Sequence, residues 1–120
     1  MSSGDHSDGA SQWRLERELA EVEHRIVALS EEFDEIVAGS ELVNTDDEHD
    51  PDGATIAFER AQVAALRDAA IRQRAALLAA IDAVETGAYG RCERCGGPIG
   101  EERLDAVPGT TRCVGCALAI

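Results

Sequence analysis

The chain has 120 residues and carries 24 acidic residues against 11 arginines, with no lysine, which gives a formal net charge of −13. Aromatic residues make up only 3%, too few for a large compact core, and a chain of this length forms one small unit or two very small ones. Its negative charge is repelled by nucleic-acid phosphates and anionic membranes, so a basic protein surface is the better-fitting partner.

The charge is unevenly distributed along the chain. Residues 1–53 hold 16 acids and 3 arginines, a net charge of −13, whereas residues 54–120 hold 8 of each and are neutral overall. Two interpretations stay open: the acidic half contacts a basic partner, or its carboxylates only keep a thin helical protein soluble. The first residues lack the basic region and apolar run of a secretory signal, and no stretch approaches 18 apolar residues. We therefore expect a cytoplasmic protein that does not span a membrane.

A long amphipathic helix is predicted in the N-terminal half. Residues 1–11 are rich in Ser, Gly and Asp and are predicted to be disordered, with Ser11 as the cap of the helix that follows. From residue 12 onward, apolar residues recur in alternating steps of four and three, which is the seam of a coiled coil. The seam consists of Leu15, Leu19, Val22, Ile26, Leu29, Phe33 and Ile36.

A second helix is predicted after an acidic break at residues 44–53. Asp50 is suited to cap this helix with Pro51 at its first position, and Gly87 is suited to end it. Its apolar residues recur every seven positions at Ile56, Val63, Ala70, Leu77 and Val84, with Leu66, Ala80 and Ile81 in a second stripe.

The two predicted helices have similar lengths and a short connection, which favours an antiparallel coiled-coil helical hairpin over residues 12–86. The predicted fold class is mostly α, with an acidic tip at residues 44–53 between the two arms. The alternative is that the two helices pair with another chain.

Four cysteines follow in residues 87–120, a segment without enough apolar residues for a core of its own. They form two short steps, Cys92–Cys95 and Cys113–Cys116, separated by seventeen residues. This is the spacing of a tetrahedral zinc site with four thiolates, in which Zn²⁺ has no open position for a substrate. The sequence therefore predicts a structural zinc-finger module and not an enzyme, and it contains no nucleophile–base pair or phosphate loop. Disulfides, a redox dithiol and an iron site are the alternatives.

The residues around the cysteines resemble the DksA/TraR zinc-finger family. The resemblance rests on the segment from Gly90 to Ile99, on residues 103–108 and on the second cysteine pair. It extends over residues 12–116, because a long helical hairpin before the zinc module is also that family's architecture. In that family the coiled coil enters the secondary channel of bacterial RNA polymerase, and no sequence-specific DNA contact is made. The resemblance thus implies a transcription regulator that binds the polymerase directly.

The family's tip motif, D-x-x-D-x-A, falls without a gap on residues 49–54. In this alignment Asp52 and Ala54 match the motif, and His49 replaces its first acid, with Asp50 next to that histidine. In a shifted alignment Asp47 and Asp50 would be the two acids, but the alanine of the motif would then have no match. The resemblance thus predicts His49, Asp50, Asp52 and Ala54 as the tip near the polymerase active site, where carboxylates would perturb the charges around bound Mg²⁺. The simpler interpretation is a solvated acidic turn with an exposed histidine.

Some members bind guanosine tetraphosphate through basic residues whose positions are taken here by Ala69, Ala76 and Ala117. Without cations there is little to hold a pyrophosphate, so binding of this nucleotide is not expected. The sequence ends four residues after Cys116, and we expect it to lack the C-terminal helix of longer members. These departures leave open a protein-binding adaptor that acts on another transcription component. A zinc ribbon that binds nucleic acid is a third reading, against which the net charge argues.

Overall fold

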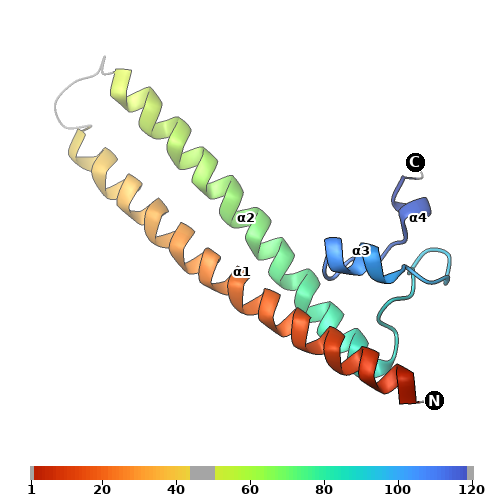
Figure 1. Ribbon diagram of the computed structural model, residues 1–120. Coiled ribbons are helices and arrows are strands. Elements are labelled where there is room, and N and C mark those ends of the chain that lie inside the picture. The colour runs from red at the N-terminus through yellow and green to blue at the C-terminus, as the bar shows by residue number, and fades with distance from the viewer. Residues whose placement is uncertain (1, 44–50, 119–120) are drawn as a thin grey trace. The chain divides into compact units, whose positions relative to one another are not determined.

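The computed structural model of the chain is mostly helical (Figure 1). Its elements are α1 (Ser2–Val43), α2 (Pro51–Thr86), α3 (Glu101–Ala106) and α4 (Val114–Leu118). The structure describes residues 2–43 and 51–118, and the side chains of residues 9–39 and 54–118. Helices α1 and α2 run antiparallel as a hairpin, and a small four-cysteine module follows. The predicted fold class is therefore confirmed.

The chain divides into two compact units, each containing part of both long helices. One unit, here called the base unit, joins Met1–Glu21 to Gln73–Ile120, and the other, the arm unit, is Val22–Arg72. The base unit therefore contains the start of α1, the end of α2, both short helices and all four cysteines.

The arm unit is held together by the predicted seam. Val22 on α1 is fully buried, and Val63 and Ala70 on α2 are buried with exposed fractions of 6% and 3%. The remaining seam positions of α1 in this unit are half-buried, as is Ile56 on α2. Burial of this apolar stripe removes area from water and favours pairing of the two helices.

The second stripe of α2 differs from the prediction at one position. Leu66, expected to contribute to it, is 52% exposed. The neighbouring Arg67 is half-buried instead, and its guanidinium carbon lies 4.7 Å from the centre of the Phe33 ring. A guanidinium over an aromatic face is attracted by the ring quadrupole while its stem covers apolar surface. A pattern of apolar residues alone could not predict that an arginine, and not Leu66, is the half-buried residue here.

In the base unit, the first seam residue of α1 and the last seam residues of α2 are buried. Leu15 on α1 and Leu77 on α2 have exposed fractions of 1% and 0%, and Ala80 and Val84 are also buried. The predicted end of α2 is confirmed, because the helix stops at Thr86 and Gly87 follows with a φ of +79°. The Ala88 amide donates a 2.8 Å hydrogen bond to the Ala83 carbonyl, which satisfies a carbonyl that the helix end leaves free.

The start of α1 differs from the prediction, and the start of α2 agrees with it. Helix α1 begins at Ser2, so Ser11 lies inside the helix and residues 2–11 are helical where disorder was expected. Extending an existing helix fixes one residue for each hydrogen bond gained, so a polar composition does not by itself end it. Helix α2 begins at Pro51, where the fixed φ of proline suits the first helical position.

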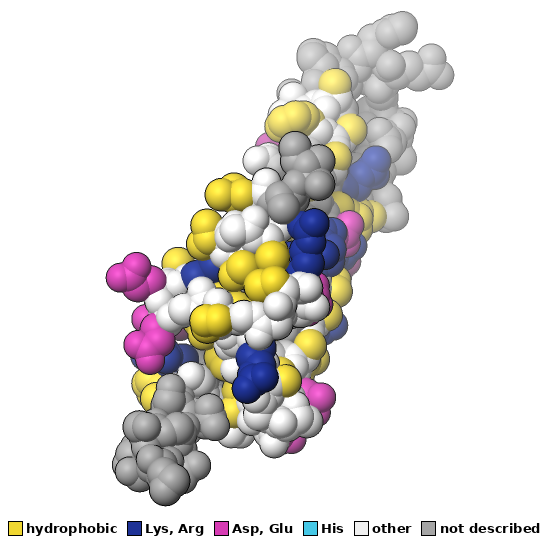
Figure 2. All heavy atoms as spheres, turned by 90° about the vertical axis from the view of Figure 1, so that its right-hand side faces the viewer, with side chains coloured by type: hydrophobic (Ala, Val, Ile, Leu, Met, Phe, Trp, Pro, Cys, Tyr) yellow, Lys and Arg dark blue, Asp and Glu magenta, His cyan; other side chains and the backbone are white. Residues whose placement is uncertain are grey.

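Apolar side chains are exposed at scattered positions. None of the helices in the described ranges has an apolar stretch long enough to cross a bilayer. Trp13, Phe58 and Leu118 nevertheless have exposed fractions of 60%, 70% and 78%. Figure 2 shows apolar side chains on one face interspersed with arginines and carboxylates. Isolated exposed apolar residues are normal in folded proteins, so these positions do not by themselves define a binding surface.

Candidate functional site

The first cysteine pair lies in a tight turn between α2 and α3. The Cys92 amide donates to the Gly97 carbonyl over 2.8 Å, and the Gly96 amide donates back to the Cys92 carbonyl over 2.9 Å. Gly96 has a φ of +76°, a conformation that glycine adopts without steric cost. The Gly97 amide points at the Cys95 sulfur, 3.4 Å away. The turn therefore directs both sulfur atoms toward one point.

The second pair spans the start of α4. Cys113 precedes this helix and Cys116 lies within it, and the Ala117 amide donates to the Cys113 carbonyl over 2.9 Å. One backbone hydrogen bond joins the two pairs, from the Glu93 amide to the Thr111 carbonyl over 2.8 Å. Two segments separated by some twenty residues are thereby held side by side.

The four sulfur atoms form one cluster. Those of Cys92, Cys95, Cys113 and Cys116 all lie within 4.8 Å of one another. The sulfurs of Cys95 and Cys113 are 3.9 Å apart, and around a tetrahedral zinc ion with Zn–S bonds of about 2.3 Å neighbouring sulfurs lie about 3.8 Å apart. A disulfide would need about 2.05 Å, and all four cysteines are free. The donor set and its spacing thus fit a four-thiolate metal site.

The electrostatics of the cluster favour a bound cation. The backbone amides of Cys113 and Cys95 lower the pKa of the Cys92 thiol to about 6, because hydrogen bonds to sulfur stabilise the thiolate. Hydrogen bonding with the sulfurs of Cys113 and Cys92 raises the pKa of Cys116 to about 12. Four crowded sulfurs cannot all become negative unless a cation compensates them. A divalent metal removes this conflict, because coordinated thiols are deprotonated.

The side chains of arginines near the cysteines donate hydrogen bonds to backbone carbonyls and to a carboxylate. Arg94 donates to the Cys116 carbonyl over 3.4 Å, Arg103 donates to the Arg112 carbonyl over 2.8 Å, and Arg112 pairs with Glu93 at 3.3 Å. Each contact joins the segment around one cysteine pair to a distant part of the module. They help to fix the relative positions of the two pairs.

The module packs on the end of α2 through a glycine. Gly109 is buried and has a φ of +86°. A Cβ placed there would lie 3.4 Å from the Ala76 carbonyl oxygen and 3.6 Å from Leu77 Cδ2. At these distances a Cβ would make ordinary van der Waals contacts, so the left-handed φ, which glycine adopts without steric cost, is what favours glycine here. The sequence analysis did not single out this glycine, because its contact is with residues more than thirty positions earlier.

A second attachment connects the module to α1. Arg14 on α1 and Asp105 on α3 form an ion pair of 2.8 Å. Tyr89 lies beside them and is half-buried, and burial raises the pKa of its hydroxyl, partly offset by a hydrogen bond with the Gly109 backbone. These residues were also missed from the sequence, since a pair 91 positions apart leaves no periodic signal.

The predicted tip residues are only partly within the described ranges. His49 and Asp50 lie outside the described residues. Asp52 is in the first turn of α2, and Ala54 follows in the same helix and is exposed. The three alanines at the positions expected for nucleotide-binding cations, Ala69, Ala76 and Ala117, are all exposed.

Comparison with known proteins identifies the cysteine module. Residues 87–119 match the family of the prokaryotic dksA/traR C4-type zinc finger. This segment contains all four clustered cysteines, so the metal of the module is Zn²⁺. The predicted cofactor is thereby confirmed.

Two further proteins are similar to the chain. Over 38 residues it is 53% identical to an uncharacterised protein of Aquifex aeolicus (strain VF5), a stretch that covers 32% of this chain and 26% of that protein. The chain thus matches about a quarter of the length of this curated relative. The structure is similar to that of transcription factor DksA2 from Pseudomonas aeruginosa, with a TM-score of 0.76 and 21% identity over 97% of this chain and 84% of the other. At this identity the likeness concerns the fold.

Proposed function

Since the chain belongs by its zinc finger to the DksA/TraR family, we propose that it is a transcription regulator that binds bacterial RNA polymerase directly. The observation that carries the proposal is the combination of that finger with a fold that is similar to that of transcription factor DksA2 over 97% of the chain. The protein acts in the cytoplasm and not as an enzyme. A metal enclosed by Cys92, Cys95, Cys113 and Cys116 leaves no position for a substrate.

The arm unit has dimensions suited to entering a channel. Each long helix contributes 22 residues to it, Val22–Val43 and Pro51–Arg72, which at 1.5 Å per residue is about 33 Å of helix. Two packed helices, each about 10–12 Å wide with side chains, form a narrow element. We propose that this element occupies the secondary channel of the polymerase.

The tip carries the regulatory effect in this proposal. Asp50 and Asp52 supply carboxylates near the Mg²⁺ and basic side chains of the polymerase active centre, with Ala54 and His49 beside them. Residues 1–53 carry the whole net charge of −13, so the tip belongs to the acidic half that a basic surface would attract. Sequence-specific contact with DNA has no part in this mechanism, because the chain's charge opposes approach to phosphates.

Guanosine tetraphosphate is not a ligand of this protein in our proposal. The exposed Ala69, Ala76 and Ala117 offer no charge to a pyrophosphate. A measured nucleotide-dependent change in polymerase affinity that disappears when Ala69 or Ala76 is replaced by Glu would contradict this point.

Binding to the polymerase is tested first by competition. The zinc-loaded protein is mixed with bacterial core RNA polymerase, and a known occupant of the secondary channel is added as competitor. We expect saturable binding that the competitor abolishes, and crosslinks from residue 52 to the channel wall. Absence of binding at micromolar concentration would sink the proposal.

The tip mechanism is tested separately by replacing carboxylates. Asp50→Asn together with Asp52→Asn should leave binding largely intact and remove the effect on transcription. Asp46→Asn with Asp47→Asn tests the frame of the motif, and Glu32→Gln with Glu35→Gln removes the same charge from the exposed face of α1. Equal transcription effects from all three pairs would mean that net charge, and not the tip, is responsible.

A protein-binding adaptor that acts on another transcription component is the second candidate. The replacement of the family's first tip acid by His49 favours it, because that position departs from the motif. Crosslinks from residue 48 or 52 that reach another transcription protein and never the polymerase channel would support it.

A further inference from the structure

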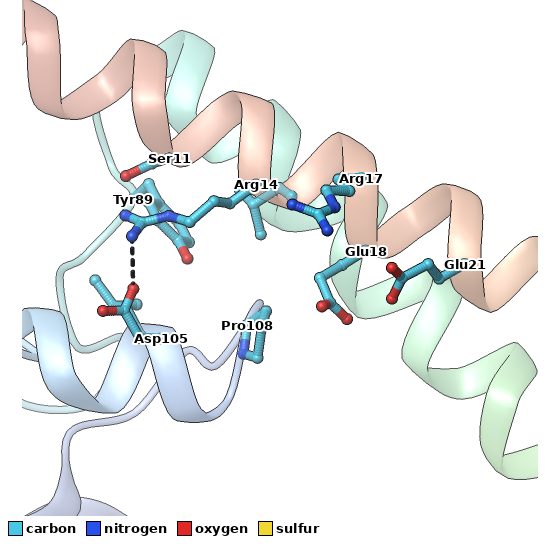
Figure 3. A pocket seen from close by; sticks show the side chains of 10 residues that line it. Ser11, Arg14, Arg17, Glu18, Glu21, Tyr89, Asp105 and Pro108 are labelled. Carbon is cyan, nitrogen blue, oxygen red and sulfur yellow. Dashed lines mark ion pairs between the residues drawn. The ribbon is translucent and has the colours of Figure 1, made fainter.

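A cleft of about 340 Å³ lies in the base unit between residues 11–21 of α1 and the zinc-finger module. Figure 3 shows it from close by, with α1 along one side and Tyr89, Asp105 and Pro108 on the other. Its volume is within the range of about 300–1,000 Å³ found for small-molecule sites. The finger's metal ligands do not line it, and neither does any residue of the tip.

The cleft combines an apolar floor with a charged rim. Leu15, which is 1% exposed, contributes the floor together with Leu104, Pro108 and the ring of Tyr89. At one end Arg14 reaches across to Asp105 at 2.8 Å, near Ser11 and Tyr89 (Figure 3). This ion pair neutralises both charges, so neither is available to attract a ligand strongly.

The opposite end carries unbalanced negative charge. Glu18 and Glu21 line it one helical turn apart, and their carboxylates lie toward the same side of the cleft (Figure 3). Among the described side chains neither has a cationic partner within ion-pair distance. Arg17 also lines this end, but its guanidinium carbon lies 5.4 Å from the centre of the Trp13 ring and stacks there. Two arginines against three carboxylates leave the lining with a formal charge of −1.

We propose that this cleft binds a small organic cation, a primary amine or guanidinium attached to an apolar body. The cationic group takes the place between Glu18 and Glu21, where charge-assisted hydrogen bonds to two carboxylates are available. The apolar body lies on Leu104, Pro108 and the Tyr89 ring, where it displaces water from apolar surface. Such a ligand contacts both α1 and the finger module, so its binding stabilises the base unit by mass action. The proposal does not depend on polymerase binding.

The single tyrosine of the chain supplies a local probe. Protein labelled with 3-fluorotyrosine gives one ¹⁹F resonance, from Tyr89 in the cleft. It is titrated with phenethylamine up to about 10 mM, where a ligand with a Kd near 1 mM is close to saturation. Phenethyl alcohol, which keeps the ring and lacks the charge, is titrated in parallel. We expect a saturable shift with the amine and a much weaker one with the alcohol.

Matched variants locate the carboxylates. Glu18→Gln with Glu21→Gln should weaken amine binding about tenfold for each charged hydrogen bond lost. Glu32→Gln with Glu35→Gln removes the same charge at the same spacing from exposed positions of α1 outside the cleft, and should leave the Kd within about twofold after salt screening. Helix content and bound zinc are measured for each variant.

Three results would overturn the proposal. They are a Tyr89 signal that the amine does not saturate at the highest concentration, an alcohol that binds as tightly as the amine, and two glutamate pairs whose replacement weakens binding equally. The first outcome would mean no site, the second an apolar cavity without charge recognition, and the third a general attraction to an acidic protein.

Discussion

The two units of the hairpin reach order by different means. The arm unit is stabilised by an apolar seam in which Val22, Val63 and Ala70 are buried. In the module of the base unit, Cys92 and Ile99 are the buried apolar residues, and order comes from backbone hydrogen bonds, positive-φ glycines and four converging sulfurs. The arms therefore depend on side-chain periodicity, whereas the finger depends on a metal and on backbone geometry.

Removal of zinc should have the largest effect, because it should unfold the finger and leave the arm unit folded. For zinc fingers the apparent free energy of metal binding is about 10–16 kcal/mol, and it is largely folding free energy. Chelation, or acid that protonates the thiolates, should unfold residues 87–118 and leave amides of the arm unit protected. Hydrogen exchange measured by peptide mass spectrometry resolves the two regions. Cys113→Ser should give the same pattern without chelator, and a module equally protected with and without zinc would refute the assignment.

Loss of a buried leucine should have the next largest effect. Leu77 is fully buried and Leu78 beside it is 51% exposed. Leu77→Ala should cost about 2–5 kcal/mol of the free energy of unfolding, because it removes buried atoms and leaves a cavity. Because Leu77 Cδ2 lies 3.6 Å from where a Cβ at position 109 would be, the attachment of the finger should loosen as well. Leu78→Ala is the matched control and should change stability by less than about 1 kcal/mol; similar losses for both variants would mean that the seam is misplaced.

The same contrast explains what the sequence could predict. The seams have a period that can be read from the chain, and positions such as Leu15, Val22 and Leu77 were predicted and are buried. The cysteine spacing likewise predicted the sulfur cluster, because a four-thiolate site restricts the distance between pairs. Gly109, the Arg14–Asp105 pair and the place of Arg67 on Phe33 were missed. Each joins residues that no local pattern relates, and each depends on how two segments approach after folding.

The start of α1 was missed for a different reason. Residues 2–11 have a composition typical of disordered segments, yet the helix begins at Ser2. Composition reports whether a segment could fold alone, whereas here the residues continue a helix that the seam from Leu15 onward already stabilises. Local composition and tertiary context thus gave opposite answers, and context determined the outcome.

Gly109 should show how strongly the finger depends on backbone geometry. Gly109→Ala places a Cβ against the Ala76 carbonyl at a φ of +86°. A left-handed conformation costs an alanine about 1–2 kcal/mol, and this strain is the main expected loss, because the new Cβ would lie at ordinary contact distances from Ala76 and Leu77. Denaturant unfolding of the zinc-loaded protein measures the loss.

Two other glycines separate strain from contact. Gly96→Ala has a φ of +76° with open space around the new Cβ, so it should cost only the conformational strain. Gly115→Ala has neither feature and should be neutral or slightly stabilising within α4. Equal losses for Gly109→Ala and Gly96→Ala would show that close packing on α2 contributes nothing.

The variant with the smallest expected effect, Arg67→Ala, tests whether a contact outside the apolar seam also stabilises the arm unit. Arg67→Ala removes the guanidinium that lies 4.7 Å from the Phe33 ring centre, and should cost about 0.5–1 kcal/mol. Arg60→Ala, at an exposed position one heptad earlier, removes the same charge without that contact. Because the net charge of the chain is −13, losing any arginine increases repulsion, and the difference between the two variants isolates the ring contact. Since salt screens the general repulsion but acts little on a contact between packed groups, the difference should persist at high ionic strength. A difference that vanishes in salt would mean that Arg67 acts only through its charge, and that the arms are held by apolar periodicity alone.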